Sequence, residues 1–577
     1  MALAFRGLVA LALGLGLTTA AMAQDAAVEM AAEAPEEVPV KAAGKSGLAR
    51  VLSPSDFAAY KQLFKQASDG DLAGVEAGLS ALKNKTLAGH VWARAYLAPK
   101  STTSFEQLQG WLQKYANYPE AAQIYKLAQS KGSGPLNDPE RRIIRGGTED
   151  GPDMTSDIET SAGSAAARKV RSFLKAGQAG EAQQYLLGEG TSALGPKDYN
   201  QLLAEVAGGL YYSGRDQAAY QLAAKAAAER DHAPLADWIA GLSAWRLQDY
   251  ASAAKHFDYM ANQPDMTSWL KSAAGFWGAR ASIAARQPHR ARALLEIAAS
   301  KPRTFYGLMA MRILGQRAPF TWTEPTLEAR SFQRVSKVSG VARAVALAQL
   351  GMRGLAEDVM MRAHGKLDHS LDGPFIALAG DLGFASVQFF AASAARTQDL
   401  KANAFPILPM QPRGGFAVDP ALIHAIVRQE SRFETDAESP SGARGLMQVL
   451  PSTAKLGDDP RKRLFEPVYN LTVGQNYVRE MMRFTSPDGN LLQTLVAYNG
   501  GPGNLQKWLA SVDYRDDPLL FIESLPSRET RGYVERVMAN MWIYQMRMGK
   551  PTTSLDDLAS GRWPIYSGSA KRVASAE

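Results

Sequence analysis

The sequence predicts an all-α (mainly α) protein, with an N-terminal superhelical, solenoid domain followed by a smaller, mostly helical domain. From about residue 165 to 400 the chain is rich in Ala and Leu, and its apolar residues recur at three- and four-residue spacing. That spacing is typical of amphipathic helices. Segments of alternating apolar and polar residues, which would indicate β-strands, are almost absent there. Residues 54–130 carry the same helical pattern.

An internal repeat extends the prediction from single helices to a superhelix. Segments that begin at Gly209, Gly241 and Gly275 can be laid over one another at spacings of 32 and 34 residues. This is the period of a helix–turn–helix repeat. Each segment places an aromatic residue in a helix of small residues, and the first two continue through a polar turn into a second Ala-rich helix. One helix pair cannot bury its apolar face alone, so neighbouring pairs are expected to stack.

Changes in composition along the chain predict its domain limits. We expect a signal peptide at 1–23, a disordered linker at 24–46, the superhelical domain at 47–400, a linker at 401–417, a second folded domain at 418–550 and a polar tail at 551–577. Three prolines and two glycines within 401–417 end the solenoid. Glycines and prolines within 132–165 predict a long loop or hinge.

The N-terminus has the three parts of a secretory signal. Arg6 supplies the positive charge, residues 8–17 form the apolar stretch, and residues 21–23 read Ala-Met-Ala, a small-residue cleavage site. A membrane anchor is the weaker alternative, because this apolar run is short for a span of about 20 residues. We therefore expect a soluble periplasmic protein with no membrane span in its mature form. The absence of cysteine means that it is not a lipoprotein.

Composition also limits the chemistry. Without cysteine there are no disulfides, thiolate metal sites or cysteine nucleophile. The histidines are scattered, and the one close pair, His364 and His369, fits no common zinc motif, so neither a metal nor another cofactor is expected. The net charge of +7 suits a polyanionic partner. Nucleic acid is the less favoured one, because the protein is expected to be exported and no basic stripe with interleaved aromatics occurs.

One acidic residue falls on the apolar face of a predicted helix. Asp419 and Pro420 form a helix start. The helix then continues through Ile423 and Val427 to Glu430, which share one face. Desolvation there would raise the pKa of the Glu430 carboxyl and keep it protonated near neutral pH, as a general acid requires. The alternative is an ordinary capped or ion-paired carboxylate at a helix end.

Three more motifs follow. Residues 439–448 place Ser, Pro and Gly turn residues ahead of a short apolar helix, where Ser439 and Gln448 could hydrogen-bond a polar ligand. A tight structural turn with Met447 in the core is the alternative. Tyr498 and Asn499 precede a glycine-rich bend, and residues 526–534 open a last helix.

Together these motifs resemble the catalytic domain of the soluble lytic transglycosylases, which belong to the lysozyme superfamily and are of the family 23 glycosidase type. The matching runs are Arg-Gln-Glu-Ser at 428–431, Gly-Leu-Met-Gln at 445–448, Ala-Tyr-Asn at 497–499 and Glu-Thr-Arg-Gly-Tyr-Val at 529–534. The resemblance covers about 418–548. It departs at Gly500, where many members have alanine. The preceding helices, with Thr-Phe-Tyr-Gly at 304–307, are similar to the family's ring-forming superhelical domain.

The resemblance implies a role for each matching residue. Glu430 becomes the catalytic acid and base of a lysozyme-like domain. The substrate cleft becomes lined by Ser439, Met447, Gln448, Tyr498, Asn499, Glu529 and Tyr533. For Glu529, an ion pair with Arg528 or Arg531 is an equal alternative.

The resemblance further implies cleavage of peptidoglycan glycan strands, at the β-1,4 bond between N-acetylmuramic acid and N-acetylglucosamine, with formation of a 1,6-anhydro end. Only one carboxylate is needed, and the nearest other candidates, Glu434, Asp436 and Glu438, lie in a polar turn where we expect solvation. Two alternatives stay open: a hydrolytic, lysozyme-type muramidase and a non-catalytic helical scaffold that binds the wall.

Overall fold

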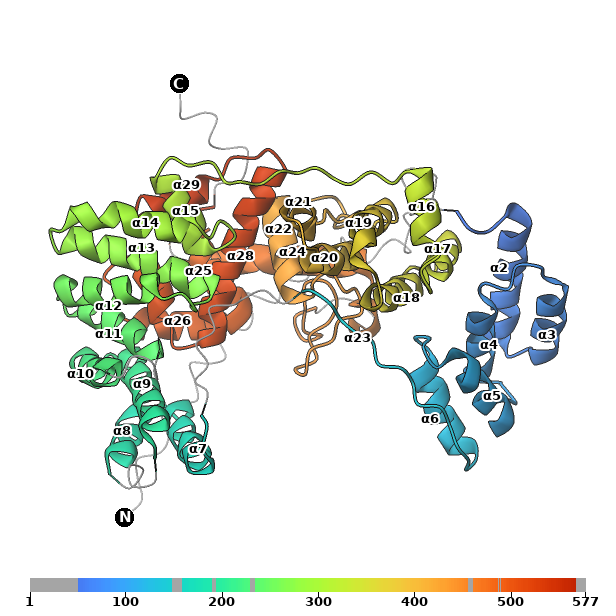
Figure 1. Cartoon of the computed structure of the whole chain (residues 1–577), viewed down its shortest axis with the longest axis horizontal. Helices are drawn as coiled ribbons and strands as arrows, with labels where there is room; N and C mark the ends of the chain where they lie inside the picture. Colours follow the sequence, from blue (N-terminus) through green and yellow to red (C-terminus); the bar gives the residue numbers. More distant parts are fainter. Residues whose placement is uncertain are drawn as a thin grey trace, which may run out of the picture. The chain divides into compact units, whose positions relative to one another are not determined.

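The computed structural model describes residues 50–147, 158–188, 194–228, 234–454, 460–485, 487 and 489–566. The predicted signal peptide and the 24–46 linker lie outside these residues. Within the described part, the chain is helical and its β pairing is limited to isolated bridges, which confirms the all-α prediction (Figure 1). None of the described helices is both long and apolar enough to cross a membrane.

The chain packs into two compact units. Unit 1 comprises Met1–Arg145, Pro325–Ala391 and Glu434–Asn470, and unit 2 comprises Gly146–Glu324, Ala392–Phe433 and Leu471–Glu577. Both the predicted superhelical domain and the predicted second domain therefore contribute segments to each unit. Each unit combines segments that lie far apart in the sequence.

Unit 1 contains the first helices and a later helical group. Its elements are α2 (Pro54–Asp69), α3 (Leu72–Ala81), α4 (Ala88–Tyr96), α5 (Phe105–Tyr115), α6 (Ala121–Lys131), α16 (Ala329–Val335), α17 (Val341–Gln349), α18 (Arg353–Gly365), η3 (His369–Leu371), α19 (Asp372–Asp381), most of α20 (Ala385–Ala394), and α23 (Pro460–Arg463). Helices α2 to α6 confirm the helical pattern predicted for 54–130. Residues 132–147 form no helix, in agreement with the predicted loop.

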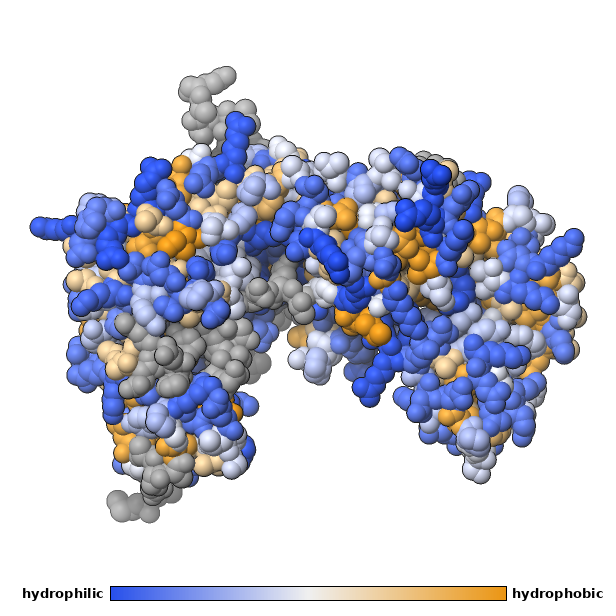
Figure 2. Space-filling model, in the orientation of Figure 1, coloured by the Kyte–Doolittle hydropathy of each residue, from blue (hydrophilic) through white to orange (hydrophobic). Residues whose placement is uncertain are grey.

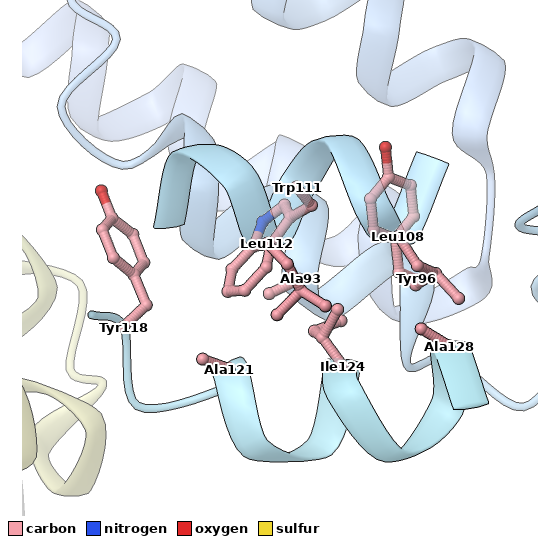
Figure 3. Packing of buried hydrophobic residues seen from close by; sticks show 9 residues of the cluster. All are labelled: Ala93, Tyr96, Leu108, Trp111, Leu112, Tyr118, Ala121, Ile124 and Ala128. Carbon is pink, nitrogen blue, oxygen red and sulfur yellow. The ribbon is translucent and has the colours of Figure 1, made fainter. Parts of the chain in front are cut away.

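A shared apolar core between α4, α5 and α6 holds these short helices together. Trp111 and Leu112 of α5 face Ile124 of α6 and Ala93 of α4 (Figure 3). The Trp111 indole nitrogen donates to the carbonyl oxygen of Gly89 at 2.9 Å, so its one polar atom is satisfied inside the core.

On the face shown in Figure 2, hydrophilic residues predominate, as expected when apolar side chains face inward.

Unit 2 contains the repeat helices and the C-terminal helices. Its elements are α7 (Ser161–Lys175), α8 (Ala179–Leu187), α9 (Pro196–Tyr212), α10 (Asp216–Ala226), α11 (Pro234–Arg246), α12 (Tyr250–Asn262), α13 (Ser268–Ala284), η2 (Pro288–Arg290), α14 (Ala291–Ala299), α15 (Phe305–Ile313), α21 (Gln398–Lys401), η4 (Ala402–Ala404), α22 (Pro420–Glu430), most of α24 (Pro467–Arg483), α25 (Leu491–Gly500), α26 (Pro502–Ser511), α27 (Pro518–Ser524), α28 (Arg528–Arg547), and α29 (Thr553–Ala559).

The predicted repeat is a series of helix hairpins. Helices α9/α10, α11/α12 and α13/α14 pair and stack in chain order (Figure 1). Each pair turns through a residue in the left-handed region, Gly214, Gln248 or Arg286, with φ of 77°, 64° and 60°. This equivalence confirms the helix–turn–helix prediction, because the same backbone turn recurs in every pair.

The Thr-Phe-Tyr-Gly run joins the solenoid helices to the C-terminal ones. Phe305 of α15 stacks on Trp542 of α28, with ring centroids 5.2 Å apart. The Tyr306 hydroxyl donates to Glu523 of α27 at 2.5 Å and accepts from the Trp277 indole at 3.0 Å. Within unit 2, the stacked repeats and helices α27 and α28 thus share one core.

The prediction of a polar tail is wrong for residues 553–559. They form α29, which packs against α15. Leu555 and Leu558, three residues apart on one face, are each 1% exposed, and the Trp542 indole donates to Ser554 at 2.8 Å. Two leucines in a mostly polar sequence are enough to dock a short helix once a partner surface exists.

The contact between α13 and α14 should depend on Gly275. A Cβ there would lie 2.7 Å from the carbonyl oxygen of Leu294 and 3.1 Å from the nitrogen of Ala298, both backbone atoms. We expect Gly275→Ala to destabilise the protein by about 1–3 kcal/mol through overpacking, despite the better helix propensity of alanine. Thermal unfolding followed by circular dichroism measures this. Gly110→Ala, where a Cβ in α5 would meet nothing within 4 Å, is the matched control and should stabilise slightly. Equal gains in both variants would contradict the close-approach argument.

Candidate active site

Helix α22 carries Glu430 at its C-terminal end. The helix begins where predicted: the Asp419 side chain accepts from the nitrogen of Ala421 at 3.0 Å, and Pro420 occupies the first turn. Its apolar residues are buried, and α22 packs along α28. Directly after Glu430 and Ser431, Arg432 and Phe433 adopt φ of 53° and 68°. Two consecutive non-glycine residues in the left-handed region turn the chain away sharply, and such strain persists only where the surroundings enforce it.

The residues just before Glu430 are fixed by α28 and by the segment that precedes α22. Arg428 donates to the carbonyl oxygen of Ala404 at 3.1 Å and to Asn540 of α28 at 3.2 Å. The side-chain oxygen of Gln429 accepts from Arg536 of α28 at 3.0 Å. These bonds set the rotation of α22 and thereby the direction in which Glu430 points.

His424 belongs to the scaffold of this helix. Burial lowers its pKa to about 4, so the ring is neutral. Its Nε2 accepts from the nitrogen of Leu408 at 3.1 Å, while Nδ1 lies 2.7 Å from the carbonyl oxygen of Pro420. A neutral ring with the proton on Nδ1 satisfies both contacts.

Two stacked tyrosines form a wall beside Glu430. Tyr498 of α25 and Tyr533 of α28 lie nearly parallel, with centroids 6.4 Å apart and an interplanar angle of 10°. Tyr477 of α24 packs against Tyr498 with a centroid distance of 5.2 Å. Burial, together with the Glu430 carboxyl, raises the pKa of both wall tyrosines well above the usual range, so they remain neutral hydroxyl donors.

The surroundings of the Glu430 carboxyl raise its pKa and favour its protonated form. Burial raises its pKa to about 7, and the charge of Glu529 adds to the rise. The Tyr533 hydroxyl lies beside the carboxyl and opposes the rise. Tyr533 is 3% exposed, and its buried hydroxyl has the Glu430 carboxyl as its hydrogen-bond partner. Near neutral pH a large fraction of Glu430 is therefore protonated, as predicted from its place on the apolar face.

Asn499 and Glu529 lie where the C-terminal end of α25 meets the first turn of α28. The Asn499 side-chain oxygen accepts from the Thr530 hydroxyl at 2.7 Å, which orients the amide at the end of α25. Glu529 is exposed. Arg531 lies over the Tyr212 ring at 4.2 Å and donates to the carbonyl oxygen of Leu525.

Ser439, Met447 and Gln448 lie in unit 1, where they belong to a tight turn. Ser439 exchanges bonds with Ala443: its nitrogen donates to the Ala443 oxygen at 2.9 Å, and its hydroxyl accepts from the Ala443 nitrogen at 3.0 Å. Gln448 has φ of 47° and donates from its side chain to the carbonyl oxygens of Ala437 and Gly445 at 3.1 Å. Met447 is fully buried. The turn is thus a structural unit in its own right.

Asn470 organises this turn, and sequence analysis missed it. Its side-chain oxygen accepts from the nitrogen of Met447, and its side-chain nitrogen donates to the carbonyl oxygens of Arg444 and Leu464, all at 2.8 Å. A Cβ on Gly445 would lie 2.4 Å from that amide, so only glycine fits. Asparagine has a low helix propensity. Its position inside a helix was therefore the one sequence feature that pointed to a special role for Asn470.

The other acidic residues of this region are engaged elsewhere. Glu434 pairs with Arg142 at 3.0 Å and Glu438 with Arg444 at 2.7 Å. Asp436 lies close enough to the buried Glu357 of α18 to raise its pKa, although burial is the larger cause. The described residues contain no cluster of three or more His, Cys, Asp and Glu side chains suited to a metal ion.

A segment of the chain that contains Glu430 matches a known domain family. Residues 410–521 match the family model described as Transglycosylase SLT domain. Over 141 residues the chain is 38% identical to the soluble lytic murein transglycosylase of Salmonella typhimurium, and over 146 residues it is 36% identical to that of Escherichia coli. These matches cover 23% and 24% of this chain and 22% of each relative, so the chain spans about a fifth of their length.

Solved structures extend the likeness to most of the fold. The 70 kDa soluble lytic transglycosylase of Escherichia coli superposes with a TM-score of 0.52 at 15% identity, over 89% of this chain and 99% of that one. An inactive mutant of the lytic transglycosylase Slt from Pseudomonas aeruginosa gives 0.51 at 19% identity, over 85% and 97%. The architecture is therefore that of the soluble lytic transglycosylases. Residues 410–521 match the Transglycosylase SLT domain family, in agreement with the resemblance noted from the motifs.

The raised pKa of Glu430 makes stability depend on pH in a specific direction. A carboxyl whose folded pKa exceeds its unfolded value stabilises the fold at low pH, and this contribution is lost as pH rises through about 7. Glu430→Gln stays neutral throughout. Its free energy of unfolding relative to the parent should therefore increase by about 3 kcal/mol between about pH 4 and pH 9. Urea unfolding of both proteins across this range measures the difference, in which other titrating groups cancel. A pH-independent difference would show that Glu430 titrates as an ordinary carboxyl.

Proposed function

We propose that the protein is a peptidoglycan lytic transglycosylase that cleaves the β-1,4 bond between N-acetylmuramic acid and N-acetylglucosamine. The observation that carries this proposal is the Glu430 carboxyl, which burial holds at a pKa of about 7 beside Tyr498 and Tyr533, within a Transglycosylase SLT domain. The names of the relatives, soluble lytic murein transglycosylases, support the same substrate class.

In the proposed reaction, Glu430 acts twice. As an acid, it donates its proton to the glycosidic oxygen, and the bond to C1 of the muramic sugar breaks. As a carboxylate, it then accepts the proton of the C6 hydroxyl of that sugar, whose oxygen bonds to C1 and closes a 1,6-anhydro ring. The proton count balances, and neither water nor a cofactor is consumed. A pKa near 7 suits both halves, because a group poised near the working pH both gives and takes a proton readily.

The groups around Glu430 suit an amide-bearing sugar. The Tyr533 hydroxyl is neutral and buried beside Glu430, and Asn499 presents an amide oriented by Thr530. We assign Tyr498, Asn499 and Tyr533 to the substrate's acetamido group and sugar ring, and Glu529 to the exposed edge of the same site. Ser439, Met447 and Gln448 remain predicted substrate contacts by motif alone. We place the reaction in the periplasm, on the basis of the signal sequence.

Replacing the proposed acid should abolish turnover while sparing binding. Glu430→Gln keeps the size and hydrogen-bonding capacity of the side chain but cannot supply a proton at neutral pH. We expect its rate of muropeptide release from purified sacculi to fall by at least about 10²–10⁴-fold, with sacculus binding retained. Glu296→Gln, on the exposed face of α14, is the matched control and should keep full activity. Residual activity within tenfold of the parent would remove Glu430 from the catalytic role.

Hydrolysis is the second candidate, because Glu529 is exposed and lies close enough to Glu430 to raise its pKa. In a hydrolase, this second carboxylate would activate water. Mass analysis of the released muropeptides separates the two reactions, since an anhydro end is lighter than a hydrated reducing end by one water. We expect anhydro products, both from the parent and from Glu529→Gln. Hydrated ends that disappear in Glu529→Gln would establish the muramidase instead.

A further inference from the structure

The two helices that carry the candidate active site both begin against one short stretch of the C-terminal chain. Glu430 ends α22, which starts after Asp419, and Asn499 lies in the last turn of α25, which starts after Asn490. The short stretch, residues 563–566, follows α29, and we call it the strap. A helix is stiff and rises about 1.5 Å per residue, so a shift at either start moves a site residue about 14–17 Å away.

The strap pairs with the start of α25. The carbonyl oxygen of Pro564 accepts from the nitrogen of Leu491 at 2.9 Å, and the nitrogen of Tyr566 donates to the carbonyl oxygen of Gly489 at 2.7 Å. These two bonds flank an isolated antiparallel bridge between the segments. The nitrogens in the first turn of a helix have no partner inside that helix. The strap satisfies one of them and thereby fixes where α25 begins.

The last residue of the strap also reaches the start of α22. The Tyr566 hydroxyl accepts from the nitrogen of Asp419 at 2.9 Å. The Asp419 carboxylate caps the helix at the nitrogen of Ala421, and it also accepts from Gln545 and Lys550, at and just beyond the end of α28, at 3.0 Å and 2.8 Å. The start of α22 is therefore held by α28 through a side chain and by the strap through the backbone.

Trp563 anchors the other end of the strap on a third segment. Its indole nitrogen donates to Asp516 at 2.9 Å, and its ring packs against Phe521 of α27 and against Tyr514, with centroid distances of 5.6 Å and 5.9 Å. Arg515 and Asp516 adopt φ of 49° and 57°. Such a conformation persists only where its surroundings enforce it. This anchor holds the strap independently of α22 and α25.

We propose that the strap sets the relative position of α22 and α25 for the reaction, with Tyr566 as the positioning residue. Its backbone nitrogen serves the start of one helix and its hydroxyl the start of the other. The far ends of these helices bring Glu430 and Asn499 to the site. The inference rests on the proposed function, because the proton transfers need the acid in register with the sugar. A misplacement of about 1 Å can lower a rate by about 10²-fold.

Two truncations and two substitutions test the proposal. Ending the chain after Arg562 removes the strap, whereas ending it after Ser567 keeps the strap and is the matched control. Tyr566→Phe removes only the hydroxyl that accepts from Asp419. Arg562→Gln, next to the strap, breaks an exposed ion pair with Asp557 and is the second control. We expect kcat for muropeptide release to fall about tenfold or more without the strap and about threefold or more in Tyr566→Phe, with both controls like the parent.

Infrared difference titration of the Glu430 carboxyl, with Glu430→Gln as the reference, gives a second readout that does not need the reaction. A displaced end of α22 leaves the carboxyl less enclosed, so its midpoint should fall from near pH 7 toward the ordinary value when the strap is absent. A strap that only added stability would lower the melting temperature and leave both kcat and this midpoint unchanged. Both are measured at a temperature at which circular dichroism shows each variant folded.

The proposal is overturned if the chain that ends after Arg562 is folded and has the kcat and the Glu430 midpoint of the parent. If that chain does not fold, Tyr566→Phe decides, and parent values of both quantities in this variant overturn the proposal. A parent protein that releases no muropeptides would refute the proposed function instead, because the midpoint still reports whether the strap positions Glu430.

Discussion

The burial of one carboxyl at the crossing of α22 and α28 is the interaction on which the site depends. Helix α22 delivers Glu430 to a position that α28 shields with Tyr533, and the pKa of the carboxyl rises as a result. That position is enforced from both sides. Arg428 and Gln429 bond to α28, while Arg428 also reaches the carbonyl oxygen of Ala404 in the segment before α22. These hydrogen bonds leave α22 little freedom to rotate, and they therefore hold the Glu430 carboxyl in its desolvated position.

Helix α28 couples this site to the rest of unit 2. Its Trp542 stacks on Phe305 of the solenoid, and the Tyr306 hydroxyl reaches Glu523 on the preceding helix, α27. One face of α28 thus lies beside the Glu430 carboxyl, and the opposite face packs on the solenoid helices. In this arrangement the repeat helices do more than extend the chain, because they fix the helix that shields the acid.

Much of this architecture could be predicted from local sequence. The helix cap at Asp419 predicts helix α22, and the position of Glu430 on its apolar face predicts that the pKa of the carboxyl is raised. The recurring segments, each with a glycine and an aromatic residue, predict the helix hairpins. Three features could not be predicted, because they depend on distant partners. They are the docking of α29 through Leu555 and Leu558, the bonding of Asn470 to the turn at Met447, and the division of the chain into units that cross the predicted domain limits.

The shielded Glu430 carboxyl holds its proton near neutral pH. Infrared difference titration of protein labelled with ¹³C-carboxyl glutamate, with the Glu430→Gln spectrum subtracted, observes this proton directly. We expect a protonated carboxyl band that disappears with a midpoint near pH 7. We also expect a higher midpoint in Tyr533→Phe, because the neighbouring hydroxyl favours the ionised form. A midpoint at the ordinary value for glutamate, about 4.3, would contradict it.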